Sequence, residues 1–121
     1  DPNLTERYFL QKHNILQSWP QLADGIFLPR VLHIWPELEA VKILRFARDA
    51  LLRNGKIYLL EMLLCKEHPS GSLLDLNMLV ESGGGLRYLL EWEKLFNKCR
   101  LGIVENIAVN PWLNLLVLQS K

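Results

Sequence analysis

The sequence has almost no net charge, few cysteines and no long apolar run. Its 14 Lys and Arg residues against 13 Asp and Glu leave a formal charge of +1, whereas non-specific nucleic-acid binding requires a clustered excess of cations. Cys65 and Cys99 have neither CxxC nor Cys/His spacing, so we expect reduced thiols in a cytoplasmic protein, with no metal site. The uncharged apolar stretches fall far short of the roughly 18–20 residues that cross a bilayer. We therefore expect neither nucleic acid nor a membrane as a partner.

The chain also lacks an initial Met and a signal-like apolar segment after its first residues. It opens Asp1-Pro2-Asn3-Leu4, which predicts that it begins in the middle of a longer gene product. Half of its 121 residues are apolar and 22% are charged, a balance typical of a globular chain that buries a core. The length fits one domain or one piece of a domain.

The first half of the chain has the pattern of a strand, a helix and a second strand. Residues 25–32 are apolar on both faces and bounded by turn residues, which favours a strand buried between helices. A helix follows, with Pro36 in its first turn and Asn54-Gly55 as its left-handed stop. Residues 56–64 then form a second buried strand, which completes a βαβ unit. The apolar positions at helical spacing are Ala40, Ile43, Leu44, Ala47 and Leu51.

The second half contains two helical segments and two β-rich runs. Residues 73–80 are apolar almost all round and predict a buried helix, after which the glycine run at 83–85 acts as a hinge. Residues 87–98 predict an amphipathic helix. Residues 101–109 and 112–119 predict an antiparallel hairpin. The expected fold class is therefore α/β, with a mostly parallel sheet and an antiparallel C-terminal hairpin.

His33 and Glu61 are the chemical candidates that the pattern itself indicates. His33 lies just past the carboxyl end of the first predicted strand, and Glu61 lies late in the second. Because the ligand crevice of an open α/β sheet forms at the carboxyl ends of its strands, we expect the two side chains to lie side by side. A carboxylate bonded to one imidazole nitrogen fixes the tautomer and leaves the other nitrogen to accept a proton. The alternative is a structural role, with a satisfied histidine and a glutamate that caps a loop.

Several segments, in the same order along the chain, resemble one protein family. VLHIWPE at 31–37 resembles "vLHDWpDe", NGKIYLLE at 54–61 resembles "GGklliiE", LDLNML at 74–79 resembles "llDlnMl" and GGGLR at 83–87 resembles "GGkeR". These motifs belong to the class I S-adenosylmethionine-dependent O-methyltransferases, a group that contains the plant caffeate and acetylserotonin enzymes and bacterial enzymes of pigment and antibiotic tailoring. The resemblance covers nearly the whole chain and implies the C-terminal half of a Rossmann-like methyltransferase sheet.

The resemblance also implies roles for particular residues. His33 matches the general base that takes a proton from the substrate hydroxyl, and Glu61 matches the carboxylate that orients this histidine. Asn14 and Ile15 match the loop positions that hold the adenine end of the cofactor, S-adenosylmethionine. Met78 matches a residue that lines the acceptor pocket. The implied partner is a small aromatic hydroxyl acceptor, and the complete protein is implied to be a homodimer.

The chain departs from the family pattern at several positions. Ile34 stands where the family has Asp after the histidine, and Leu86 stands where an acidic residue follows the glycines. Pro29 replaces a common Lys, and Asn14 replaces the Asp on the adenine side. The glycine-rich cofactor strand and the N-terminal dimerisation domain of the family have no counterpart in residues 1–121.

Two hypotheses about function follow from this comparison. In the first, residues 1–121 are a partial methyltransferase catalytic domain, inactive alone, whose parent protein is the enzyme. In the second, the chain is a degenerate, non-catalytic module that keeps the fold for protein association. The second hypothesis rests on the replaced acidic residues, and on the strand edge and apolar helix faces that an incomplete sheet exposes.

Overall fold

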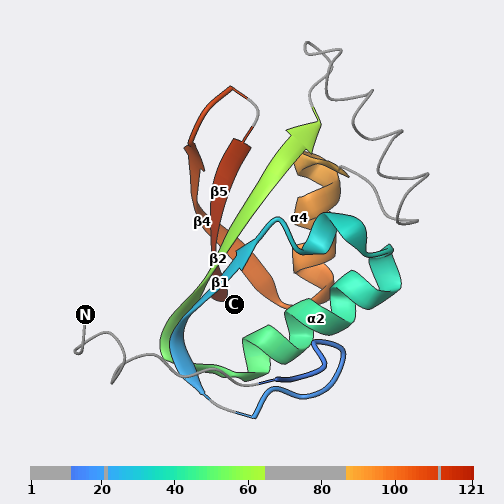
Figure 1. The fold of residues 1–121 in the computed structure, drawn as a ribbon. Coiled ribbons are helices and arrows are strands. Elements are labelled where there is room, and N and C mark those ends of the chain that lie inside the picture. Colours follow the sequence, from blue (N-terminus) through green and yellow to red (C-terminus); the bar gives the residue numbers. More distant parts are fainter. Residues whose placement is uncertain (1–11, 21, 65–86, 112) are drawn as a thin grey trace, which may run out of the picture.

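The computed structural model describes residues 12–20, 22–64, 87–111 and 113–121. These residues form a sheet with its helices packed on the same side (Figure 1). The elements in chain order are β1 (Ala23–Pro29), the 3-10 turn η1 (Leu32–Ile34), α2 (Glu37–Asp49), β2 (Leu51–Leu64), β3 (Arg87–Tyr88), α4 (Leu89–Lys98), β4 (Leu101–Ala108) and β5 (Leu113–Ser120).

The sheet combines a parallel pair of strands with an antiparallel hairpin. Its strand order is β1-β2-β5-β4, and the short β3 pairs with the end of β2. β1 runs parallel to β2, whereas β5 is antiparallel to both β2 and β4. α2 connects β1 to β2, so the expected βαβ unit is present, and the hairpin expected near the C-terminus is β4 and β5. The predicted α/β class is confirmed.

The first strand ends earlier than the sequence predicted. We expected it to continue to residue 32, but β1 stops at Pro29, because Arg30 adopts a left-handed φ of 52° that is incompatible with extended strand backbone. The N–H of Arg30 still donates to the carbonyl of Leu60 on β2 at 2.7 Å. The chain therefore leaves the sheet at its carboxyl end and turns directly into η1.

The first helix also ends earlier than predicted. α2 stops at Asp49, whereas we expected Asn54-Gly55 to end it. The N–H of Ala23 donates to the carbonyl of Ala50 at 2.8 Å, so the chain is drawn into the sheet immediately after the helix. Asn54 does adopt a left-handed φ of 65°, but it does so within β2. The turn signal therefore marks an irregularity in a strand and not the end of a helix.

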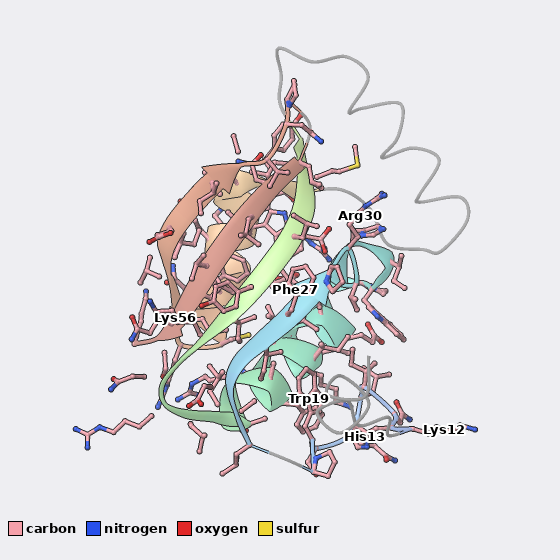
Figure 2. The ribbon with its side chains drawn as sticks, turned by 60° about the vertical axis from the view of Figure 1, so that its left-hand side comes forward. Lys12, His13, Trp19, Phe27, Arg30 and Lys56 are labelled. Carbon is pink, nitrogen blue, oxygen red and sulfur yellow. The ribbon has the colours of Figure 1, made fainter. Side chains whose placement is uncertain are left out.

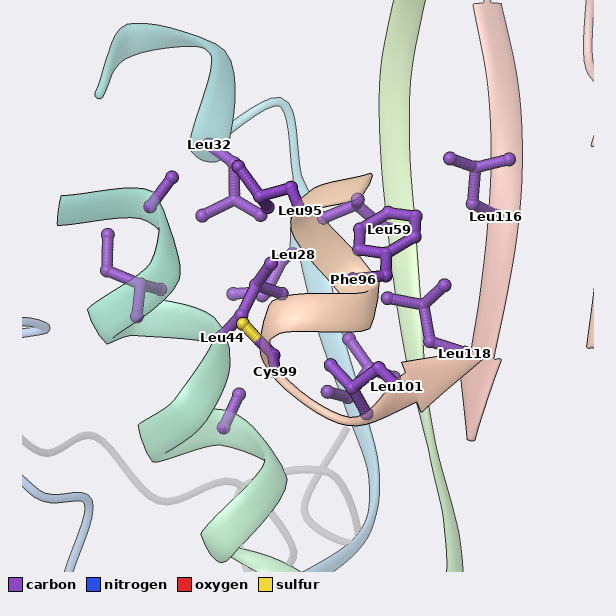
Figure 3. Close-up of a cluster of buried hydrophobic side chains, with 14 of the residues drawn as sticks. Leu28, Leu32, Leu44, Leu59, Leu95, Phe96, Cys99, Leu101, Leu116 and Leu118 are labelled. Atoms are coloured by element: carbon purple, nitrogen blue, oxygen red, sulfur yellow. The ribbon is translucent and has the colours of Figure 1, made fainter. Parts of the chain in front are cut away.

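The hydrophobic core fills the space between the helices and the sheet (Figure 3). The helical stripe predicted on α2 is buried apart from Leu51, which belongs to β2. On α4 the rings of Trp92 and Phe96 are stacked with their centroids 5.7 Å apart. Side chains on the other face of the sheet remain accessible, as shown by Phe27, which is 58% exposed. The largest fully buried side chains are Trp92, Phe96, Leu32, Ile43, Leu44, Ile57, Leu59, Leu95, Leu101, Leu116, Leu118 and Glu61.

Candidate active site

A single turn of 3-10 helix places His33 at the carboxyl end of the sheet. The N–H of Trp35 donates to the carbonyl of Leu32 at 3.1 Å, which closes the turn. Leu32 is fully buried in the core and anchors the turn there (Figure 3). His33 follows directly and is only 5% exposed. Its ring is thus held against the end of the sheet instead of extending into solvent.

Glu61 lies on β2, on the face of the strand that packs against the helices. Because side chains alternate along a strand, Glu61 shares this face with Ile57 and Leu59, and all three are fully buried. Glu61 Oε1 accepts the N–H of Leu32 at 3.1 Å, and Oε2 accepts the Nδ1–H of His33 at 3.1 Å. A buried carboxylate requires such partners, since its desolvation is otherwise strongly unfavourable. The structure places His33 beside Glu61, as the sheet topology predicted.

These hydrogen bonds determine what His33 can do chemically. An ionised carboxylate only accepts hydrogen bonds, so the proton of the neutral His33 ring lies on Nδ1, which faces Glu61. Nε2 then keeps its lone pair and can accept a proton from a substrate. The residues that follow His33 in the chain line a hollow of about 310 Å³. Its lining residues are Ile34, Trp35, Pro36 and Glu39.

Arg87 on β3 binds the same turn through its carbonyl groups. Its Nη1 donates to the carbonyl of Leu32 at 3.4 Å, and its Nη2 donates to the carbonyl of Trp35 at 2.9 Å. The guanidinium carbon lies 4.9 Å from the centroid of the Trp92 ring. The sequence indicated Arg87 only as the last residue of a glycine motif, because its partners lie 55 and 52 positions away. Its place between a glycine run and a helix was the only local signal.

The loop expected to hold adenine is ordered by its own hydrogen bonds. Asn14 Oδ1 accepts the N–H of Leu16 at 3.0 Å, and the indole N–H of Trp19 donates to the carbonyl of Ile15 at 3.3 Å. Asn14 is exposed and Ile15 is half-buried. A carboxamide pairs well with the adjacent donor and acceptor of an adenine edge, and an apolar side chain suits the face of the ring. Asn14 and Ile15 are thus compatible in residue type with adenine, and their role at the cofactor stays a prediction.

This loop and the His33 turn lie toward opposite ends of β1. Figure 2 shows His13, the neighbour of Asn14, toward the amino end of the strand, and Arg30 at the carboxyl end. The structure therefore brings together the predicted base and its carboxylate, but it does not bring the predicted adenine loop to them. Met78, expected in the acceptor pocket, lies outside the described residues. The described residues supply an acid–base pair and an adenine-compatible loop, without joining them into one cofactor site.

Two groups between the helices have shifted pKa values. Lys98 on α4 donates to Glu37 on α2 at 2.7 Å, and this hydrogen bond, with the charge of the ammonium, holds the pKa of Glu37 below its usual value. Burial raises the pKa of the Cys99 thiol, which donates to the carbonyl of Val41 on α2 at 3.7 Å. Both contacts join α4 to α2 and help to hold the two helices together.

Among the described residues, no three His, Cys, Asp or Glu side chains are grouped so that they could hold a metal ion. None of the helices in this part of the chain has the length and apolar character needed to cross a membrane. Cys99 is a free, buried thiol.

Solved structures with the same arrangement define the class of protein. The chain resembles mitomycin 7-O-methyltransferase MmcR in fold, with a TM-score of 0.91 at 22% identity over 99% of this chain and 36% of that one. It is similar to NcsB1, an O-methyltransferase from neocarzinostatin biosynthesis, with a TM-score of 0.88 at 26% identity over 99% and 36% of the two chains. NcsB1 was solved with S-adenosyl-L-homocysteine and 1,4-dihydroxy-2-naphthoic acid. The fold is the C-terminal half of a Rossmann-like methyltransferase domain.

Sequence comparison gives the family. Residues 4–100 match the O-methyltransferase domain family. Norreticuline-7-O-methyltransferase from Papaver somniferum is 39% identical over 80 residues, which are 62% of this chain and 22% of that protein. The chain belongs to the O-methyltransferase domain family. It spans 22% of the length of the norreticuline enzyme and 30% of the length of a scoulerine-9-O-methyltransferase from the same plant, which is less than a third of either relative.

Proposed function

We propose that this chain carries the acid–base part of an O-methyltransferase that transfers a methyl group from S-adenosylmethionine to a hydroxyl of a small aromatic acceptor, with His33 as general base. The observation that carries the proposal is the buried hydrogen bond between His33 and Glu61 at the carboxyl end of the sheet. Family membership and the S-adenosyl-L-homocysteine bound to NcsB1 support the cofactor. The naphthoic acid bound to the same relative supports an aromatic hydroxyl acceptor.

His33 acts on a hydroxyl group that is a weak nucleophile while it keeps its proton. Nε2 takes that proton as the hydroxyl oxygen forms its bond to the incoming carbon. Glu61 stabilises the positive charge that develops on the ring, because it already accepts the Nδ1–H. S-adenosylmethionine, when bound, would supply that carbon as the methyl group of its sulfonium, and cleavage of the C–S bond would leave neutral S-adenosylhomocysteine. A positioned base of this kind typically contributes about 10²–10⁴-fold to the rate.

We further propose that residues 1–121 are the C-terminal part of the catalytic domain and are inactive alone. Asn14 and Ile15 would contact adenine, and Met78 would line the acceptor pocket. The complete protein would be a cytoplasmic homodimer. Its glycine-rich strand and N-terminal dimerisation domain would complete the cofactor site and the acceptor pocket. The fraction of the curated relatives that the chain spans, 22% of one and 30% of another, supports this division. Titration of S-adenosylmethionine into the 121-residue chain should release little heat, and micromolar binding would contradict the proposal.

Replacement of His33 in the complete protein tests the role of the base. We expect His33→Ala to lower kcat for methylation of phenolic acceptors, 1,4-dihydroxy-2-naphthoic acid among them, by about 10²–10⁴-fold. S-adenosylmethionine should bind the variant and the wild-type protein equally, because the substitution removes a proton acceptor and no proposed cofactor contact. Unchanged methyl transfer by the variant would remove the proposed role.

A second function, a non-catalytic module for protein association, is favoured by one surface feature. Ile34, where the family has Asp, is 41% exposed directly beside the candidate base. Leu38, at the start of α2, is also apolar and is 74% exposed, and exposed apolar surface of this kind suits a protein contact. Absence of methyl transfer by the wild-type complete protein to every phenolic acceptor would favour this second function.

A further inference from the structure

We propose that Arg87 is a positioning residue that fixes the orientation of the His33 ring by holding the backbone of its turn. This inference rests on the proposed function, because the orientation matters only if His33 accepts a proton. Arg87 acts through the carbonyl groups of Leu32 and Trp35, one on each side of the His33–Ile34 pair.

The turn needs support because it is short. η1 has only three residues, and the N–H of its C-cap residue, Trp35, donates to the carbonyl of Leu32. A single 3-10 turn is weak, since the geometry of its hydrogen bonds is poor. Glu61 fixes the N–H of Leu32, and Arg87 fixes the carbonyls of Leu32 and Trp35. The Glu61 carboxylate thus holds the N–H donor of the turn, and the Arg87 guanidinium holds its two carbonyl acceptors.

The chemistry of the contact requires arginine. Nη1 and Nη2 reach different carbonyl groups, and the planar fork places both donors at once. The face of the guanidinium lies against Trp92, which is fully buried and stacked on Phe96. The turn is therefore fixed relative to the core of α4 as well as to β2. A lysine would keep the charge, but it would lose the fork and the flat surface that stacks on the indole.

The expected consequence is a loss of rate without a loss of binding. A small displacement of a catalytic group can lower a rate by about 10²-fold. We expect Arg87→Lys in the complete protein to lower kcat for methyl transfer by about 10–100-fold, with the KM values of acceptor and cofactor within about twofold of wild type. Arg45→Lys is the matched control, since Arg45 also donates to a backbone carbonyl, that of Lys98 at 3.3 Å, but on the exposed surface away from the turn.

A measurement on the His33 ring separates this inference from the proposed function. In the complete protein labelled with ¹⁵N-histidine, wild type and Arg45→Lys should show His33 with its proton on Nδ1. Arg87→Lys should show a mixture of the two tautomers, because the loosened turn weakens the bond to Glu61. If the wild-type protein transfers no methyl group, the proposed function fails, and the ring spectra still decide the role of Arg87.

The inference is overturned if Arg87→Lys matches Arg45→Lys in kcat and in the His33 ring spectrum. A variant that loses activity through KM alone would also overturn it, because that result indicates a binding role. Should Arg87→Lys fail to fold, Arg87→Gln, which keeps a planar group against Trp92, replaces it in both measurements. If neither variant folds, Arg87 supports the fold as a whole and the positioning role is wrong.

Discussion

Replacing Glu61 by Gln is the substitution that most sharply separates a catalytic pair from a structural one. Gln has nearly the shape of Glu, but it offers one acceptor and one donor group where the carboxylate offers two acceptors. Two donors point at this side chain, the N–H of Leu32 and the Nδ1–H of His33, each at 3.1 Å. The amide oxygen can serve only one of them, so the pair must change.

The two arrangements open to the amide have different consequences. If its oxygen accepts the N–H of Leu32, its NH₂ faces Nδ1 of His33, and the ring proton must move to Nε2. If its oxygen accepts from His33, the buried N–H of Leu32 loses its acceptor, which costs about 1–3 kcal/mol. A backbone N–H cannot change its character, whereas an imidazole can change its tautomer. We therefore expect the first arrangement, in which the ring loses the lone pair that the base needs.

The expected result in the complete protein is a large effect on rate and a small effect on stability. Glu61→Gln should lower kcat for methyl transfer by about 10²–10⁴-fold and lower the free energy of unfolding in urea by no more than about 1–3 kcal/mol. Glu93→Gln, at an exposed position on α4, is the matched control and should change neither quantity. Wild-type kcat in a folded Glu61→Gln protein, with or without a loss of stability, would show that the pair is structural and not catalytic.

Three further predictions concern the fold of the chain itself. In Gly55→Ala the new Cβ would lie 2.9 Å from the Leu52 carbonyl oxygen and 3.0 Å from that of Asp24. The free energy of unfolding measured in urea should therefore fall by about 1–3 kcal/mol. Gly25→Ala is the control, because its new Cβ would have no atom nearer than 3.4 Å, and it should unfold like wild type. The pKa of Glu37 is lowered in the folded state, so its stabilising contribution is complete above its usual pKa. The difference in stability between wild type and Glu37→Gln should therefore shrink as the pH falls below about 4.3, and it should also shrink in salt. Because burial raises the pKa of Cys99, iodoacetamide should modify this thiol slowly at neutral pH and readily in urea, as read by peptide mass spectrometry, and rapid modification of the folded chain would contradict its burial.

The sequence predicted the elements whose signals are periodic and local. The apolar spacing on α2, the continuous apolar run in β2 and the paired runs of β4 and β5 each identify an element without reference to the rest of the chain. The placement of His33 beside Glu61 was also predictable, because it follows from the rule that parallel strands bring their carboxyl ends to one edge of a sheet. This prediction needed the topology and no detail of the turn.

Features set by distant contacts were not predictable. Arg30 ends β1 through a left-handed φ of 52°, and a non-glycine residue in that conformation gives no clear sequence signal. The Asn54-Gly55 pair was expected to end α2, but the hydrogen bond from Ala23 to Ala50 ends the helix first. Arg87 reaches its carbonyl partners across more than fifty residues, which periodicity cannot show.

We propose that Glu61 holds His33 as a proton acceptor, and the ring nitrogens of His33 report this arrangement. The measurement is the ¹⁵N spectrum of the histidine-labelled wild-type complete protein, with the His33 signals assigned by comparison with His33→Gln. For the neutral ring we expect a proton on Nδ1 and a bare lone pair on Nε2. A neutral ring with its proton on Nε2 would exclude His33 as the base, because such a ring could not take a proton from a hydroxyl while bound to Glu61.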